Sequence, residues 1–164
     1  MSLNRVVFFG KSGCGKSTAI STLCHSNINC EKNFDYGLID IGPDDQLQVI
    51  EAKTTKAIEL IEQREHDSTI GYIMLIDNQD PDYLQSLQEQ LKILFPILQN
   101  TALVVGVCQK KASIYGELER VNLQLRGCGL RAPAFEIDPN NESDISLLLQ
   151  ALLISLDEKL TQVH

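Results

Sequence analysis

The sequence predicts a three-layer α/β domain in which helices cover both faces of a mostly parallel sheet. Short apolar runs typical of strands alternate with stretches of helical periodicity along the chain. The runs Gly71–Asp77 and Thr101–Val107 are almost continuously apolar, as expected of strands buried on both faces. A glycine-rich turn separates the first apolar run from the first helical stretch. Together these observations favour parallel strands joined by crossover helices.

Composition and charge favour one domain spanning residues 1–164. Apolar residues make up 43% and charged residues 22% of the chain, which is enough to form a core. The formal charge of −8 disfavours non-specific binding to nucleic acid or anionic membranes. No run is long enough to span a membrane, and Val6–Phe9 is too short for a signal peptide. Five cysteines without C-x-x-C spacing predict free thiols and a cytoplasmic location.

The first half of the chain is expected to contain a strand, a helix, a hairpin and a second helix. Arg5–Phe9 is the strand, and Lys16–Cys24 is the helix. Phe34–Ile41 and Gln46–Glu51 predict two strands joined by a Gly-Pro-Asp-Asp turn. Lys56–Glu65 follows with helical periodicity. The hairpin would place one antiparallel strand at the edge of the sheet.

The second half continues the alternation. Asp80-Pro81 is expected to cap the next helix, and Pro96 to end or kink it. A helix over Ser113–Leu125 and a short strand over Ala134–Ile137 follow.

The last helix has the clearest periodicity, with Ser143 as its expected N-cap. Its apolar stripe consists of Ile145, Leu148, Leu149, Leu152, Leu153, Leu156 and Leu160. The whole chain therefore predicts about six strands and about five helices.

One motif predicts phosphate chemistry, because it matches G-x-x-x-x-G-K-[ST] at every fixed position. Glycines let the backbone adopt positive φ and approach an anion closely, and the following helix N-terminus attracts negative charge. Lys16 can reach the β and γ phosphates, and the Ser17 hydroxyl can bind Mg²⁺. The expected nucleotide-binding residues of this loop are Gly10, Lys11, Ser12, Gly13, Cys14, Gly15, Lys16, Ser17 and Thr18.

A site of this kind also needs an acidic residue that organises the metal from the end of a neighbouring strand. Glu51 ends one expected strand, and Asp77 ends another. We favour Glu51, with Ser17, as the metal site. Asp77 remains the alternative, although Asp77 and Asn78 together can also be an ordinary polar start of a loop.

With these motifs in place, the sequence resembles the Ras-like small GTPases, and in particular a bacterial and archaeal branch related to gliding-motility GTPases. The resemblance implies a GTP-binding, Mg²⁺-dependent switch whose partner is a small dimeric protein of the roadblock type. Only the glycine-rich loop is mechanistically specific, and the rest is similarity of fold. The similar segments are Gly10–Thr18, Asp35–Gly37, Gly71–Asn78, Val104–Val107, Ala132–Pro139 and Ser143–Leu153.

The chain departs from this family in both switch segments. The first switch of the family carries a threonine that senses the γ-phosphate, whereas Asn29–Asn33 contains none. The second switch carries Pro-Gly-Gln, whereas this chain has Glu51–Lys56 at that point. The glycine that contacts the γ-phosphate and the glutamine that orients water are both missing. Glu51 falls where many relatives keep their metal-organising acid, which is the reason for preferring it.

The base-reading tetrad is also altered. Relatives end it with an aspartate that accepts hydrogen bonds from guanine, whereas Lys111 is a donor at that position. Gln109 and Lys110 are the candidate base contacts, and they do not select guanine over adenine.

Two functions follow from this combination. The favoured one is a nucleoside triphosphate-binding switch, with GTP by resemblance or else ATP, whose hydrolysis is slow or absent. The alternative is a pseudo-GTPase interaction module with a vestigial site. A small-molecule kinase is disfavoured, because the arginines are scattered and form no lid segment.

Overall fold

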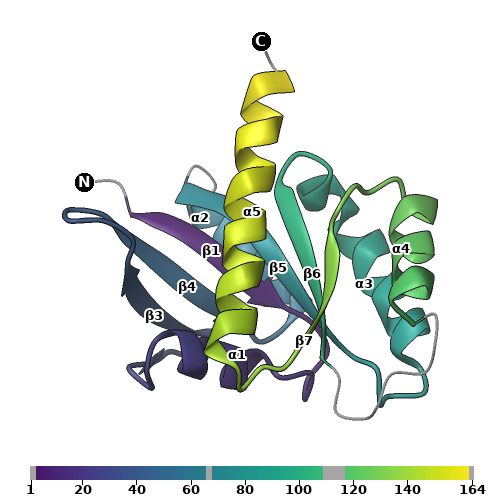
Figure 1. The fold of residues 1–164 in the computed structure, drawn as a ribbon, viewed down its shortest axis with the longest axis horizontal. Coiled ribbons are helices and arrows are strands. Elements are labelled where there is room, and N and C mark those ends of the chain that lie inside the picture. Colours follow the sequence, from purple (N-terminus) through teal and green to yellow (C-terminus); the bar gives the residue numbers. More distant parts are fainter. Residues whose placement is uncertain (1–2, 66–67, 109–116, 163–164) are drawn as a thin grey trace.

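The computed structural model describes residues 3–65, 68–108 and 117–162. These residues form one seven-stranded sheet with the order β2-β3-β4-β1-β5-β6-β7 (Figure 1). The expected α/β fold class is therefore confirmed. The strands are β1 Asn4–Phe9, β2 Asn29–Cys30, β3 Phe34–Asp40, β4 Gln46–Ala52, β5 Thr69–Asp77, β6 Ala102–Cys108 and β7 Ala134–Ile137. The helices are α1 Lys16–Leu23, α2 Thr55–Glu65, α3 Tyr83–Leu98, α4 Glu117–Gly127 and α5 Glu142–Gln162.

The sheet is parallel except at one edge. Strands β4, β1, β5, β6 and β7 run parallel, and β3 pairs antiparallel with β4. This confirms the hairpin expected from the turn after β3. The two-residue strand β2 pairs antiparallel with β3 and adds a strand to the six expected. A strand this short leaves no periodic pattern that the sequence could show.

Helices cover both faces of the sheet, with α1 and α5 on one side and α2, α3 and α4 on the other (Figure 1). Strand β1 serves both layers, because successive side chains point to opposite faces. Val6 and Phe8 pack in the layer with α1 and α5, whereas Val7 and Phe9 pack in the other. Since β1 lies in the middle of the sheet, the loop that follows it emerges between the two helical layers.

The apolar stripe of α5 packs closely on the sheet. A Cβ atom at Gly71 would lie 2.7 Å from Leu152 Cδ1, and one at Gly106 would lie 2.9 Å from Leu148 Cδ1. Both glycines therefore leave room for leucine side chains that are fully or almost fully buried. This contact fixes α5, and with it the β7–α5 loop, against β5 and β6.

Two expected helix starts were wrong. Helix α5 begins after Asn141, whose Oδ1 accepts hydrogen bonds from the backbone N–H of Ser143 at 3.0 Å and of Asp144 at 3.3 Å. Asn141 is therefore the N-cap in place of Ser143. Helix α3 begins after Asp82 rather than at Asp80, because the Asp80 carboxylate accepts a bond from the Asp82 N–H at 3.0 Å.

The other structural expectations concerned Pro96, the fourth helix, the cysteines and membrane-spanning segments. Helix α3 continues through Pro96 to Leu98 before it ends. The first part of the helix expected over Ser113–Leu125 lies outside the described residues, and α4 covers the remainder.

All five cysteines lie in the described part of the chain, and each is a free thiol. Among the described residues, the structure contains no helix that is both long and apolar enough to cross a membrane.

The cap of α5 can be tested by mutation. We expect Asn141→Ala to lower the free energy of unfolding by about 1 kcal/mol, because two backbone N–H groups lose their acceptor. Ser143→Ala is the matched control and should change it by less than about 0.5 kcal/mol. Urea denaturation followed by circular dichroism measures both. The cap assignment is wrong if the serine variant is the more destabilised of the two.

Candidate functional site

The loop between β1 and α1 adopts the conformation that its glycines allow. Gly10, Gly13 and Gly15 have φ values of 150°, 84° and 103°. A Cβ atom at Gly10 would lie 2.4 Å from the carbonyl oxygen of Leu75, so the loop passes directly against β5. A side chain at this position would require the backbone to move. The motif is therefore held in a curved conformation that other residues could not adopt without strain.

Lys16 is the first residue of α1 and folds back across the loop. Its Nζ donates a hydrogen bond to the carbonyl oxygen of Gly10 at 2.6 Å. Only 5% of the residue is exposed, so the ammonium group is held close to the loop rather than in solvent. The first N–H groups of a helix have no intrahelical partner. The start of α1 thus presents a buried positive charge beside unpaired donors, which favours an anion.

Ser17 and Glu51 meet although they are far apart in the sequence. The Ser17 hydroxyl lies 2.9 Å from both carboxylate oxygens of Glu51 and donates to them. Glu51 is 7% exposed. The contact arises because β1 and β4 run parallel and pair Phe8 with Glu51. The two strands therefore end side by side, at the end of the sheet where the glycine-rich loop begins.

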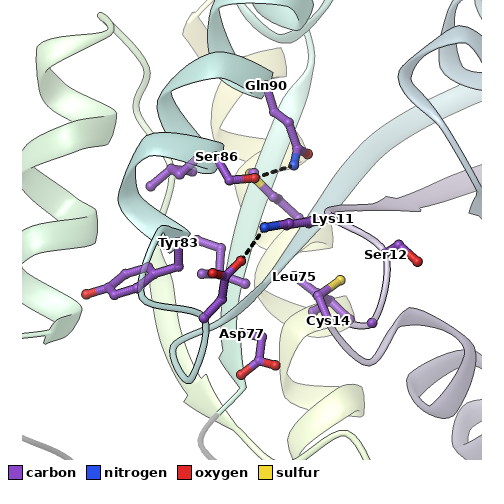
Figure 2. Close-up of a pocket in the computed structure, with 13 residues that line it drawn as sticks. Lys11, Ser12, Cys14, Leu75, Asp77, Tyr83, Ser86 and Gln90 are labelled. Carbon is purple, nitrogen blue, oxygen red and sulfur yellow. Dashed lines mark hydrogen bonds and ion pairs between the residues drawn. The ribbon is translucent and has the colours of Figure 1, made fainter.

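The alternative acid, Asp77, lies elsewhere. Its Oδ1 accepts a hydrogen bond from the Gln79 N–H at 2.9 Å, which makes a local turn after β5. Asp77 lines a separate small cavity and not the one that contains Ser17 and Glu51 (Figure 2).

A cavity of about 490 Å³ lies over the loop, within the range of sites for small ligands. It brings together seven of the expected residues, namely Ser12, Gly13, Gly15, Lys16, Ser17, Thr18 and Glu51. Gly10, Lys11 and Cys14 do not line it. Gln109 and Lys110 lie outside the described residues.

Five further residues line this cavity and were not singled out from the sequence. They are Asp35, Lys53, Asp138, Pro139 and Asn140. Each of these residues lies near the start of a strand or just after the end of one, at the end of the sheet from which the loop emerges. The general tendency of ligands to bind beyond the carboxyl ends of parallel strands could have indicated the last three.

Lys11 points away from the large cavity toward α3, whereas Ser12 points to the other side of the loop (Figure 2). Lys11 Nζ lies 2.5 Å from Asp80 Oδ2. This hydrogen bond lowers the pKa of the Asp80 carboxyl and raises the pKa of Lys11. Both groups therefore stay charged near neutral pH, and the pair ties the loop to the turn before α3.

The cavity in Figure 2 measures about 70 Å³, which is too small for a nucleotide. Cys14 borders it and is 2% exposed. Burial raises the pKa of this thiol above its ordinary value. Cys14 is therefore a packed residue of the loop and not an activated nucleophile.

Comparison with known proteins supports the fold. No family model matches the chain, and no curated protein matches its sequence. A solved structure described as nucleolar GTP-binding protein 1 of Plasmodium falciparum superposes with a TM-score of 0.71 at 15% identity. The match covers 99% of this chain and 91% of that one. At this identity the likeness establishes the shared fold alone, and a fold does not by itself assign an activity.

The close approach of the loop to β5 leads to a prediction about stability. We expect Gly10→Ala to lower the free energy of unfolding by about 2 kcal/mol or more, because the new Cβ atom would collide with the Leu75 carbonyl. Gly127→Ala is the matched control, since nothing lies within 4 Å of a Cβ atom there. That substitution in α4 should be neutral or stabilising by about 0.5 kcal/mol. Equal stability of the Gly10 variant and the wild type would contradict this account of the loop.

Proposed function

We propose that the chain binds a nucleoside triphosphate together with Mg²⁺ in the 490 Å³ cavity and acts as a regulatory switch of the small GTPase type. The observation that carries the proposal is the buried Glu51 carboxylate, hydrogen-bonded to Ser17 at the edge of the glycine-rich loop. A carboxylate and a hydroxyl beside a buried lysine are the groups that a Mg²⁺–phosphate complex requires.

The residues present fit a magnesium ion. Mg²⁺ prefers oxygen ligands and is usually bound through one or two protein groups plus phosphates and water. Ser17 would supply a hydroxyl ligand, and Glu51 would orient it and balance the charge. When bound, the ion would neutralise phosphate charge. The loop glycines and the start of α1 would hold the phosphates through backbone N–H groups.

Slow or absent hydrolysis forms part of the proposal. Phosphoryl transfer to water needs a group that orients the attacking water. Among the described residues that line the large cavity there is no glutamine, histidine or arginine. The three carboxylates that line it already have partners, Asp35 in the ion pair with Lys53, Glu51 with the Ser17 hydroxyl and Asp138 with the Asn140 N–H. We therefore propose that the site positions phosphates but activates water poorly.

The base is proposed from resemblance alone. GTP is favoured by the similarity to Ras-like proteins of the gliding-motility branch and by the fold shared with a protein named as GTP-binding. Lys111 in the base-reading tetrad argues against guanine selectivity, so ATP is the competing ligand. A protein partner of the roadblock type rests on the same resemblance. Mass spectrometry of the nucleotide that co-purifies with the chain decides between the two bases.

The binding proposal is tested with Lys16→Ala. Removing the ammonium should weaken nucleoside triphosphate binding by about 100-fold or more, because a buried charge-assisted contact is lost. Lys92→Ala removes an exposed lysine of α3 and is the matched control, which should bind like the wild type. Calorimetric titration with GTP and with ATP measures the affinities. If the wild type binds neither, the pseudo-GTPase interaction module is the better description.

The metal assignment is tested separately. Glu51→Gln should reduce the gain in nucleotide affinity that Mg²⁺ provides by about tenfold, because the carboxylate charge beside Ser17 is lost. Affinity measured with excess EDTA should change little. Asp77→Asn is the control and should keep the full Mg²⁺ effect. The reverse pattern would transfer the role to Asp77.

A further inference from the structure

Lys53 was not among the site residues expected from the sequence. It comes directly after β4 and two positions beyond Glu51, in the segment where the resembling family carries its second switch. Its side chain is 40% exposed and lines the same cavity as Lys16 and Ser17. The cavity is therefore lined by a second ammonium-bearing side chain, which is more exposed than that of Lys16.

Two contacts hold Lys53 in the described structure. Its Nζ lies 3.0 Å from Asp35 Oδ1 and donates a hydrogen bond to the carbonyl oxygen of Glu31 at 3.2 Å. Both partners belong to the hairpin of β2 and β3 at the sheet edge, Asp35 within β3 and Glu31 just after β2. The nearby Asp35 carboxylate also raises the pKa of Lys53. Lys53 is therefore a charged link between the cavity and the edge hairpin.

Lys53 also lines a further cavity, which is smaller than the one that contains Ser17 and Glu51. This cavity measures about 190 Å³ and continues beyond the loop toward the start of α2. The residues that line both cavities are Ser12 and Lys53. Lys53 and Ser12 therefore lie on the side of the larger cavity that faces the smaller one.

The order of the strands sets the direction in which a nucleotide would lie. The Asp138–Asn140 loop, which lines the cavity, follows β7 on one side of β1. Glu51 and Lys53 follow β4 on the other side of β1. A ligand that fills the cavity from the β7 side to the β4 side would therefore have one end near Lys53.

We propose that Lys53 is the residue by which this site distinguishes a nucleoside triphosphate from a diphosphate. The inference rests on the proposed nucleotide-binding function. The Lys53 ammonium binds the terminal phosphate and gives up part of its contact with Asp35 and with the Glu31 carbonyl. Because those contacts link the end of β4 to the edge hairpin, the presence of the terminal phosphate changes how firmly the hairpin is held. Lys53 would thereby replace the threonine and glycine that are missing from the two switch segments.

The experiment compares the wild type with Lys53→Gln, Lys53→Arg and Lys56→Gln. Calorimetry with Mg²⁺ present measures the affinities for GDP, for ADP and for the β,γ-imido analogues of GTP and ATP, which resist hydrolysis. For the base that binds, Lys53→Gln should weaken binding of the triphosphate analogue by about tenfold or more and binding of the diphosphate by less than about twofold. Lys53→Arg, which keeps the charge, should retain most of the preference. Lys56→Gln removes an exposed lysine of α2 that lines neither cavity and should change neither affinity.

The outcomes separate the inference from the function on which it rests. If the wild type binds none of the four nucleotides, the proposed function is wrong, and the role of Lys53 is wrong with it. If the wild type binds and Lys53→Gln weakens both ligands equally, Lys53 contributes only general charge, and the inference alone is wrong. An unchanged affinity for the triphosphate analogue in Lys53→Gln overturns it as well. A selective loss for the triphosphate analogue, absent in Lys56→Gln, supports it.

Discussion

The parallel pairing of β1 with β4 is the constraint on which the proposed site depends. It places Phe8 opposite Glu51, so that β4 ends beside the loop that leaves β1. A shift of one residue would turn Glu51 to the other face of the sheet and separate it from Ser17. The register is well specified because β1 is buried on both faces, with Val6 and Phe8 in one layer and Val7 and Phe9 in the other. Core packing therefore determines the geometry of the polar contact.

Three neighbouring segments contact the glycine-rich loop and hold it in place. The carbonyl of Leu75 lies behind Gly10, and Pro139 lies where a Cβ atom at Gly15 would come within 3.0 Å. Asp80 holds Lys11 from the turn before α3. A loop fixed from three sides loses little conformational freedom when it binds an anion, which lowers the cost of binding. The same contacts explain why alanine would not fit at the crowded glycines.

The inner and outer parts of the large cavity differ in their side chains. Lys16 and Ser17 line the inner part, where Glu51 accepts a hydrogen bond from Ser17. Among the described residues of its outer part, none corresponds to the switch threonine, glycine or glutamine of the Ras-like family that the sequence resembles. Lys53 and Asp35 form an ion pair there. The Lys53 side chain is 40% exposed and that of Asp35 is 19% exposed, so the pair is partly buried at the margin of the cavity.

Much of the architecture could be predicted from local properties of the chain. Apolar periodicity predicted the fold class, the order of the elements and the antiparallel hairpin, and glycine spacing predicted the tight loop between β1 and α1. Glu51 was preferred over Asp77 because of the resemblance to the Ras-like family, and the structure places it against Ser17. These features extend over a few consecutive residues, which is why the amino-acid order was sufficient.

The tertiary structure alone decided the remaining contacts. Nothing local distinguishes Asn141 from Ser143 as a cap, and both residues are suitable for that position. The pairing of Lys11 with Asp80 and of Lys53 with Asp35 joins residues that are distant in the sequence. Such pairs form only after strand order and register have brought separate strand ends to one edge of the sheet. Because that arrangement results from packing of the entire core, no short segment of the chain contains the information that specifies it.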